Sequence, residues 1–174
     1  MKKLYFTLLF AFLFFQKTHA ERFEFTPTAK LAYDKVMTLE FQEARNLIYQ
    51  VKRDDPENMI IYLVENYIDF FSVFINENKQ EFKQLERNKD FRIKMVRKGP
   101  KDSPYYNYTQ AEIKLQWALA RLKFEEFFTA FNEVSSAYKL LKRNQKKYPN
   151  FMANKKSLGI LPVSYTHLTL PTKA

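Results

Sequence analysis

Two carboxylates at helical spacing are the residues of this chain best placed for acid–base chemistry. Glu65 and Asp69 stand four positions apart, so a helix would hold both side chains on one face. Such a pair can act as acid and base when its surroundings separate the two pKa values. In the alternative role, the two groups pair with Lys or Arg of a neighbouring helix or line a groove. We expect this structural role.

Other common catalytic and ligand-binding residues are absent between residues 21 and 161. This stretch contains no His and no Cys, and its only glycines are Gly99 and Gly159. Ser–His catalysis, Cys–His catalysis and the usual zinc sites therefore lack their residues here. A Gly-rich phosphate loop cannot form either. We expect neither catalytic residues nor a bound cofactor or metal in this stretch.

The first twenty residues show the three parts of a secretory signal peptide. Lys2 and Lys3 form a positive start, residues 4–15 are apolar, and Thr18-His19-Ala20 places small residues before Glu21. The apolar run is shorter than the ~20 residues that a membrane-spanning helix needs. We therefore expect cleavage before Glu21, export to the periplasm, and a mature protein that does not span a membrane.

The end of the chain, VSYTHLTLPT at residues 163–172, differs in composition from the charged, aromatic sequence before it. Its reverse translation can be written gtctcttatacacatctgacgctgccgacga, which resembles the adapter used in transposase-based sequencing libraries. The codons of Pro162 and Lys173 permit the same reading frame. We expect residues 162–174 to be non-native, with a native sequence that reaches Leu161 and a gene that has been cut short.

Basic residues gather in two stretches of the chain. Removing Lys2, Lys3, Lys17 and Lys173 with the two ends leaves 25 basic against 19 acidic residues, a net charge of +6. Export argues against nucleic acid as a partner, so these stretches favour an anionic glycan, lipid head groups or an acidic protein. The alternative is a solvated outer face of long helices. The candidate basic face comprises Lys83, Arg87, Lys94, Arg97, Lys139, Lys142, Arg143 and Lys146.

Helix signals divide the chain into pairs. Thr26, Asp55 and Ser103 each precede a Pro, and a capping residue followed by Pro is typical of a helix start. Asn78 and Glu81 have capping-box spacing. Residues 59–75 are apolar almost all round, which is typical of a buried helix. A membrane span is disfavoured there because Glu65 and Asp69 lie near its middle. The predicted pairs are 27–37 with 41–52, 57–75 with 79–97, and 105–124 with 126–146, followed by a helix at 152–161.

Helix pairs that recur at this interval predict an all-α protein, stacked as a solenoid. Residues 41–58 resemble the second half of a tetratricopeptide repeat, with Phe41, Ala44 and Pro56 at the motif's aromatic, small and Pro positions. Phe127 and Ala130 repeat the aromatic–small step. The stretches NYIDFF and AEIKLQWALARLKF resemble exported helical-repeat proteins of Bacteroidota whose activity is undefined. The resemblance implies a tetratricopeptide-like α-solenoid over residues 21–161, truncated in a fourth pair.

Solenoids of helix pairs bind partners on a concave surface. We therefore expect a scaffold that binds another protein or a peptide in the bacterial envelope. The alternatives are the recruiting or regulatory N-terminal region of an exported enzyme whose catalytic part is missing, and a module for an anionic glycan or the envelope surface. Tyr105, Tyr106 and Tyr108 could also reach a groove, although the core is the better expectation for each. The candidate groove residues are Tyr62, Asn66, Asp69, Gln110, Lys114 and Trp117, all on first helices of the predicted pairs.

Overall fold

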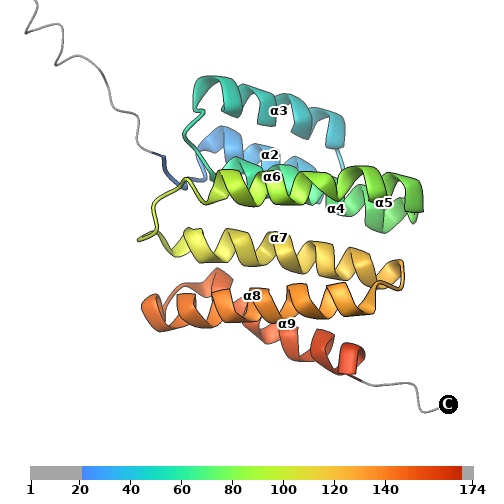
Figure 1. Ribbon diagram of the computed structural model, residues 1–174. Helices are drawn as coiled ribbons and strands as arrows, with labels where there is room; N and C mark the ends of the chain where they lie inside the picture. Colours follow the sequence, from blue (N-terminus) through green and yellow to red (C-terminus); the bar gives the residue numbers. More distant parts are fainter. Residues whose placement is uncertain (1–20, 170–174) are drawn as a thin grey trace, which may run out of the picture.

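The computed structural model describes residues 21–169, and side chains at positions 21–159 and 161 (Figure 1). The predicted signal peptide at residues 1–20 and residues 170–174 of the predicted tail lie outside the described residues. The described chain is helical, which confirms the all-α prediction. Its helices are α2 (Pro27–Met37), α3 (Phe41–Asp54), α4 (Ile60–Asn76), α5 (Lys79–Leu85), α6 (Arg87–Val96), α7 (Pro104–Lys123), α8 (Phe127–Lys147) and α9 (Met152–Thr169).

At three of the predicted helix starts, the predicted capping side chain accepts hydrogen bonds from the first turn. The Thr26 hydroxyl accepts a hydrogen bond from the Ala29 amide, and the Ser103 hydroxyl accepts one from the Tyr105 amide. The Asn78 side chain accepts from the amides of Gln80 and Glu81. These bonds satisfy amides of the first helical turn that have no partner within the helix.

Three helix boundaries differ from the prediction. The fourth helix is interrupted near Glu86, which separates α5 from α6. Asp55 is the C-cap of α3, so the Asp55-Pro56 pair does not start α4, which begins at Ile60 instead. The last helix, α9, continues beyond Leu161 to Thr169, into residues predicted to be non-native. Local helix signals thus located the elements but not all of their ends.

The start of α4 is held by the segment that precedes α2. The Arg22 amide donates to the Glu57 carbonyl at 2.9 Å, and the Met59 amide donates to the Arg22 carbonyl at 2.7 Å. The Asn58 side chain accepts from the Glu24 amide and donates to the Glu24 carbonyl. This short bridge fixes residues 21–26 against the chain at the base of α4.

The helices stack in chain order, from α2 and α3 at one end to α8 and α9 at the other (Figure 1). The first helices of successive pairs are in contact, α2 with α4 and α4 with α7, while α2 packs on α3 and α7 on α8. A chain that stacks helix pairs in this way has a helical-repeat-like all-α architecture. In such a layout each helix pair completes the burial of its neighbour.

Two apolar clusters form the interior. The larger one extends through α2, α3 and α4 to Phe82 and Trp117, both fully buried. The smaller one lies between α7, α8 and α9 and includes Val134, Leu141 and Leu161. Ala44 and Ala130, the small residues of the tetratricopeptide-like steps, are also fully buried. The aromatic partners differ, since Phe41 packs against the larger cluster whereas Phe127 is 57% exposed.

Each turn from a first to a second helix contains a non-glycine residue with positive φ. These residues are Leu39, Glu77 and Glu125, with φ of 63°, 50° and 62°. The turns at Leu39 and Glu125 share a bonding pattern, because the next amide in each, Glu40 and Glu126, donates to a carbonyl five residues back. Left-handed backbone with this bonding is typical of helix C-termini, where glycine is the usual residue.

Candidate partner-binding groove

Five of the six predicted groove residues lie in the interior. Asn66 and Trp117 are fully buried, and Tyr62, Asp69 and Gln110 are at most 8% exposed. Lys114 is half-buried. The helices α4, α6 and α7 pack against one another where these side chains lie, so a groove built on these side chains is not what the structure shows. Their polar stripe faces a neighbouring helix rather than a partner.

Glu65 and Asp69 share a cation from α6. The Arg92 guanidinium lies 2.7 Å from an Asp69 oxygen and 3.2 Å from a Glu65 oxygen. Lys52 of α3 pairs with the other Glu65 oxygen at 2.6 Å. Burial alone would raise the pKa of Glu65, but the nearby charges of Arg92 and Lys52 outweigh it and lower that pKa. The pair therefore has the structural role expected for it.

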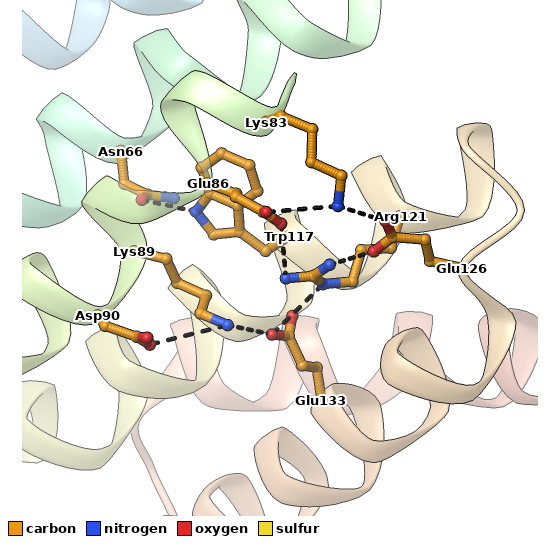
Figure 2. Close-up of polar contacts among 9 residues, drawn as sticks. All are labelled: Asn66, Lys83, Glu86, Lys89, Asp90, Trp117, Arg121, Glu126 and Glu133. Carbon is orange, nitrogen blue, oxygen red and sulfur yellow. Dashed lines mark hydrogen bonds and ion pairs between the residues drawn. The ribbon is translucent and has the colours of Figure 1, made fainter. Parts of the chain in front are cut away.

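A chain of hydrogen bonds continues this interface into α7. The Trp117 indole donates to the Asn66 side-chain carbonyl at 3.0 Å, as Figure 2 shows, and Arg92 donates to the same oxygen at 3.2 Å. The Asn66 amide donates to the Gln116 side chain at 2.6 Å. Because the chain crosses from α6 through α4 to α7, it fixes the relative rotation of three helices.

A second ionic cluster joins α5 and α6 to α7 and α8 (Figure 2). The Arg121 guanidinium pairs with Glu126 and, at 3.2 Å, with Glu86. Glu133 pairs with Lys89 and lies 3.6 Å from Arg121. Every acidic group of this cluster faces a positive partner, so the cluster acts as a tie between helix pairs, and the second oxygen of Glu133 is buried without a hydrogen-bond partner among the described residues.

Open space is found elsewhere, beside the first helices of the pairs. One cavity of about 240 Å³ is bordered mainly by α4, α7 and α9, and a second of about 360 Å³ by α2, α4, α7 and α9. Tyr33, Tyr67, Tyr108 and Lys156 border both cavities. We call the two adjoining cavities the tyrosine groove.

The aromatic rings of the tyrosine groove support one another edge to face. Tyr33 and Tyr67 have ring centroids 5.8 Å apart at an interplanar angle of 81°. Phe25, carried by the N-terminal segment, meets Tyr33 at 5.9 Å and 78°. Edge-to-face contact is a favoured geometry for aromatic pairs. The walls of the groove are therefore held in place before any partner arrives.

Glu112 of α7 borders the smaller cavity of the groove. Its carboxyl group accepts hydrogen bonds from the Tyr67 hydroxyl, at 3.2 Å, and from the Ser157 hydroxyl of α9. Burial raises the pKa of Glu112, opposed by these two hydroxyls and by the charge of Lys156. Burial and the nearby Glu112 also raise the pKa values of Tyr67 and Tyr108, so both phenols stay protonated at neutral pH.

The predicted groove residues and the residues of the tyrosine groove lie on the same first helices, but on different faces of them. Tyr67 directly follows the predicted Asn66, and Glu112 lies two positions after the predicted Gln110. One residue rotates a helix by ~100°, so a one-residue error in phase exchanges an interior face for an open one. Tyr105 and Tyr108, for which the core was the better expectation, pack against the larger apolar cluster and also border the larger cavity.

The eight candidates for the basic face are all exposed. Lys83 pairs with Glu126 and Glu86, and Arg97 donates to Gln110. The four on α8, namely Lys139, Lys142, Arg143 and Lys146, form no ion pair with any described residue. Of the eight candidates, Lys83 is therefore the one in an ion pair with described residues, and the four on α8 form a continuous unpaired group.

No family model, curated protein or solved structure matches the chain, so the functional argument rests on the geometry above. Within residues 21–169, no helix is both long enough and apolar enough to cross a membrane. In the same range, His, Cys, Asp and Glu side chains nowhere converge in a group of three that could hold a metal ion.

Proposed function

We propose that this protein is a scaffold that binds a segment of another protein in the tyrosine groove. The observation that carries the proposal is the alignment of Tyr33, Tyr67 and Tyr108, which come from three successive first helices and border two adjoining cavities. Binding sites in proteins are concave and mostly apolar, with a few placed polar groups. The groove has this character, and its polar groups are the tyrosine hydroxyls, Glu112 and Lys156.

Tyrosine is well suited to such a surface. Its ring contributes a large contact area, and its hydroxyl can bond to a partner, at a low cost in side-chain entropy. Tyr33, Tyr67 and Tyr108 are also positioned by aromatic neighbours, so little ordering remains for the moment of binding. Preorganised contacts of this kind raise affinity because fewer groups must be immobilised.

The proposed architecture is a tetratricopeptide-like solenoid in which first helices line the inner surface. Three features support it: contact between successive first helices, buried Ala44 and Ala130 at the motif's small positions, and cavities bordered by first helices. We further propose that the protein acts in the periplasm after removal of residues 1–20, based on the signal pattern in the sequence. The intact mass of the protein from a periplasmic extract would support export if it corresponds to a chain that begins at Glu21.

Site-specific photocrosslinking tests the groove. Benzoylphenylalanine placed at Tyr108 is expected to crosslink one defined partner in cells that make the protein, whereas the same probe at Tyr49 is not. Tyr49 is a matched control because it is a helical tyrosine, 68% exposed, that borders neither cavity. A synthetic copy of the crosslinked segment should then bind the purified protein, and Tyr33→Ala should weaken it at least tenfold. Equal crosslinking from both positions would contradict the proposal.

A second candidate function is favoured by the unpaired basic group on α8. Lys139, Lys142, Arg143 and Lys146 lie within two turns and meet no acidic group of the described residues. Such a surface can attract an anionic glycan. Changing all four to Gln should abolish retention on a heparin column at low salt, whereas Lys83→Gln, which removes an already paired amine, should leave retention nearly unchanged. Equal retention of both variants would exclude this candidate.

A further inference from the structure

Glu112 differs from the other deeply placed carboxylates in its partners. Asp69 pairs with Arg92, Glu133 with Lys89, and Glu65 with both Arg92 and Lys52. Glu112 accepts only from two hydroxyl groups, and no Lys or Arg of the described residues lies within ion-pair distance of it. Glu112 is partly buried, and withdrawing a carboxylate from water without a cation is costly, so this group is either protonated or completed by something that enters the cavity.

The cavity beside Glu112 has walls that suit a cation. Tyr33, Tyr67 and Tyr108 border it, and the face of an aromatic ring attracts an ammonium or guanidinium group. A carboxylate offers about four lone-pair positions, and the hydroxyls of Tyr67 and Ser157 occupy two of them. A guanidinium or ammonium group that entered would therefore find both an open acceptor and aromatic faces.

Lys156 is the one positive side chain among the residues that border this cavity. It is exposed, it also borders the larger cavity, and its charge acts on Glu112 from beyond ion-pair distance. A negative ligand would meet this single amine but would also approach Glu112. The charge at the base of the cavity therefore favours a positive group over a negative one.

We propose that the smaller cavity of the tyrosine groove receives an Arg or Lys side chain of the bound segment, which pairs with Glu112. This inference rests on the proposed function, because it identifies the chemistry of the segment that the groove holds. Tyr67 and Ser157 are positioning residues, since their hydroxyls orient the Glu112 carboxylate towards the entering cation.

Four libraries of capped nonapeptides test the proposal. They share random flanking positions and differ only in the central residue, which is Arg, its neutral analogue citrulline, Lys, or its neutral analogue norleucine. Bound peptides are quantified by mass spectrometry after incubation with the purified full chain at pH 7.5. We expect the Arg and Lys libraries to be retained about tenfold more than their neutral counterparts, because charge-assisted hydrogen bonds are the stronger ones.

Matched variants assign that preference to Glu112. Glu112→Gln keeps the shape of the side chain and should equalise the four libraries, and Tyr67→Phe should weaken the preference in part. Lys156→Met removes the competing charge and should increase retention of the cationic libraries a few-fold. Glu43→Gln is the control, because Glu43 is exposed, pairs with Lys35 and borders neither cavity. Thermal melting of each variant verifies that it is folded.

Different experimental results would overturn the proposed groove and the inference about its cationic ligand. Equal retention of cationic and neutral libraries, or a cation preference that survives Glu112→Gln, overturns the inference about the Arg or Lys side chain. If Tyr33→Ala still weakens binding in that case, the proposed groove remains supported. Absence of retention for all four libraries overturns the inference and also counts against the proposed groove.

Discussion

The carboxylates on the two sides of α4 differ in their partners. Towards α6, Glu65 and Asp69 meet Arg92, and the interface is closed by matched charges and by the Trp117–Asn66 hydrogen bond. Towards the tyrosine groove, Tyr67 donates to Glu112, which has hydroxyl partners and a cavity beside it. Both regions are rich in aromatic and acidic side chains. The difference in cation supply separates a region that holds helices together from the one that we propose accepts a partner.

This comparison gives a physical criterion for locating a site in a helical stack. A buried ion pair contributes little net stability, but removing one partner leaves a charge without compensation and is strongly destabilising. An acidic group that already lacks a cation has no such dependence on a neighbour. The four expected outcomes below test this contrast, beginning with the largest.

Removing the shared cation should produce the largest loss. Arg92→Met keeps much of the apolar volume but leaves Asp69 and half-buried Glu65 without their common partner. We expect the free energy of unfolding to fall by ~3–5 kcal/mol, the range found when one member of a buried pair is removed. Urea denaturation followed by circular dichroism measures it. A loss below ~1 kcal/mol would mean that water reaches these carboxylates.

Removing an uncharged hydrogen-bond donor from the same interface should lower the free energy of unfolding by a smaller amount. Trp117→Phe removes the indole donor to Asn66 and part of a fully buried side chain. We expect a loss of ~2 kcal/mol, from the missing hydrogen bond and the reduced burial together. The same urea measurement applies, with Tyr49→Phe as an exposed aromatic control. A loss as large as that of Arg92→Met would show that charge is not the dominant feature of this face.

On the groove side, neutralising Glu112 should instead increase the free energy of unfolding. Glu112→Gln is expected to stabilise the fold by ~1 kcal/mol at pH 8, because a partly buried, unpaired charge is replaced by a neutral amide. The pKa of Glu112 is raised on folding, so the wild-type protein is penalised above that pKa and relieved as the pH falls towards the unfolded value near 4.5. The advantage of the variant should therefore shrink between pH 8 and pH 5.

The groups around Glu112 are not expected to obscure this pH dependence. Tyr33, Tyr67 and Tyr108 have raised pKa values, and Lys156 is the one Lys or Arg among the residues that border the same cavity. Glu65 provides the contrast, because its pKa is lowered on folding and its contribution is lost only as the pH falls below its unfolded value. An advantage of Glu112→Gln that grew on acidification would contradict the assignment.

An exposed ion pair should matter least. Lys30 and Asp34 are 3.3 Å apart on the surface of α2, with both side chains more than half exposed. We expect Lys30→Ala to change the free energy of unfolding by less than ~0.5 kcal/mol, as solvent and salt screen such pairs. Urea denaturation at low and high salt measures both the change and its screening. A loss above ~1 kcal/mol would show that pairing alone, without burial, stabilises this fold.

The helices of this protein were predictable because their signals are local. Thr26, Asn78 and Ser103 cap helices through amides two or three residues away, so neither tertiary contacts nor neighbouring helices are needed to find them. Asp55 shows the limit, since the same capping type ended α3 rather than starting α4. The deciding contact there is the bridge between Arg22 and Asn58, which joins residues far apart in the sequence.

The site was not predictable because α4 is apolar almost all round. With little hydrophobic contrast between its faces, the polar stripe of Asn66 and Asp69 suggested an open surface, whereas Arg92 of α6 makes that stripe an interior one. The position of Arg92 relative to α4 depends on the packing of two separate helices. The absence of a cation beside Glu112 likewise depends on where α7 and α9 come together, which no local pattern encodes.

The turns at Leu39, Glu77 and Glu125 have a consequence for how repetition in this chain can be recognised. Their left-handed backbone recurs at the same place in three helix pairs, yet one of the three residues is Leu and two are Glu, and their spacing along the sequence is unequal. A residue-by-residue alignment of the pairs would therefore find little, even though each pair turns through one left-handed residue. Superposing the backbones of these turns would therefore be a better test for an ancestral duplication of the pairs than aligning their amino-acid sequences.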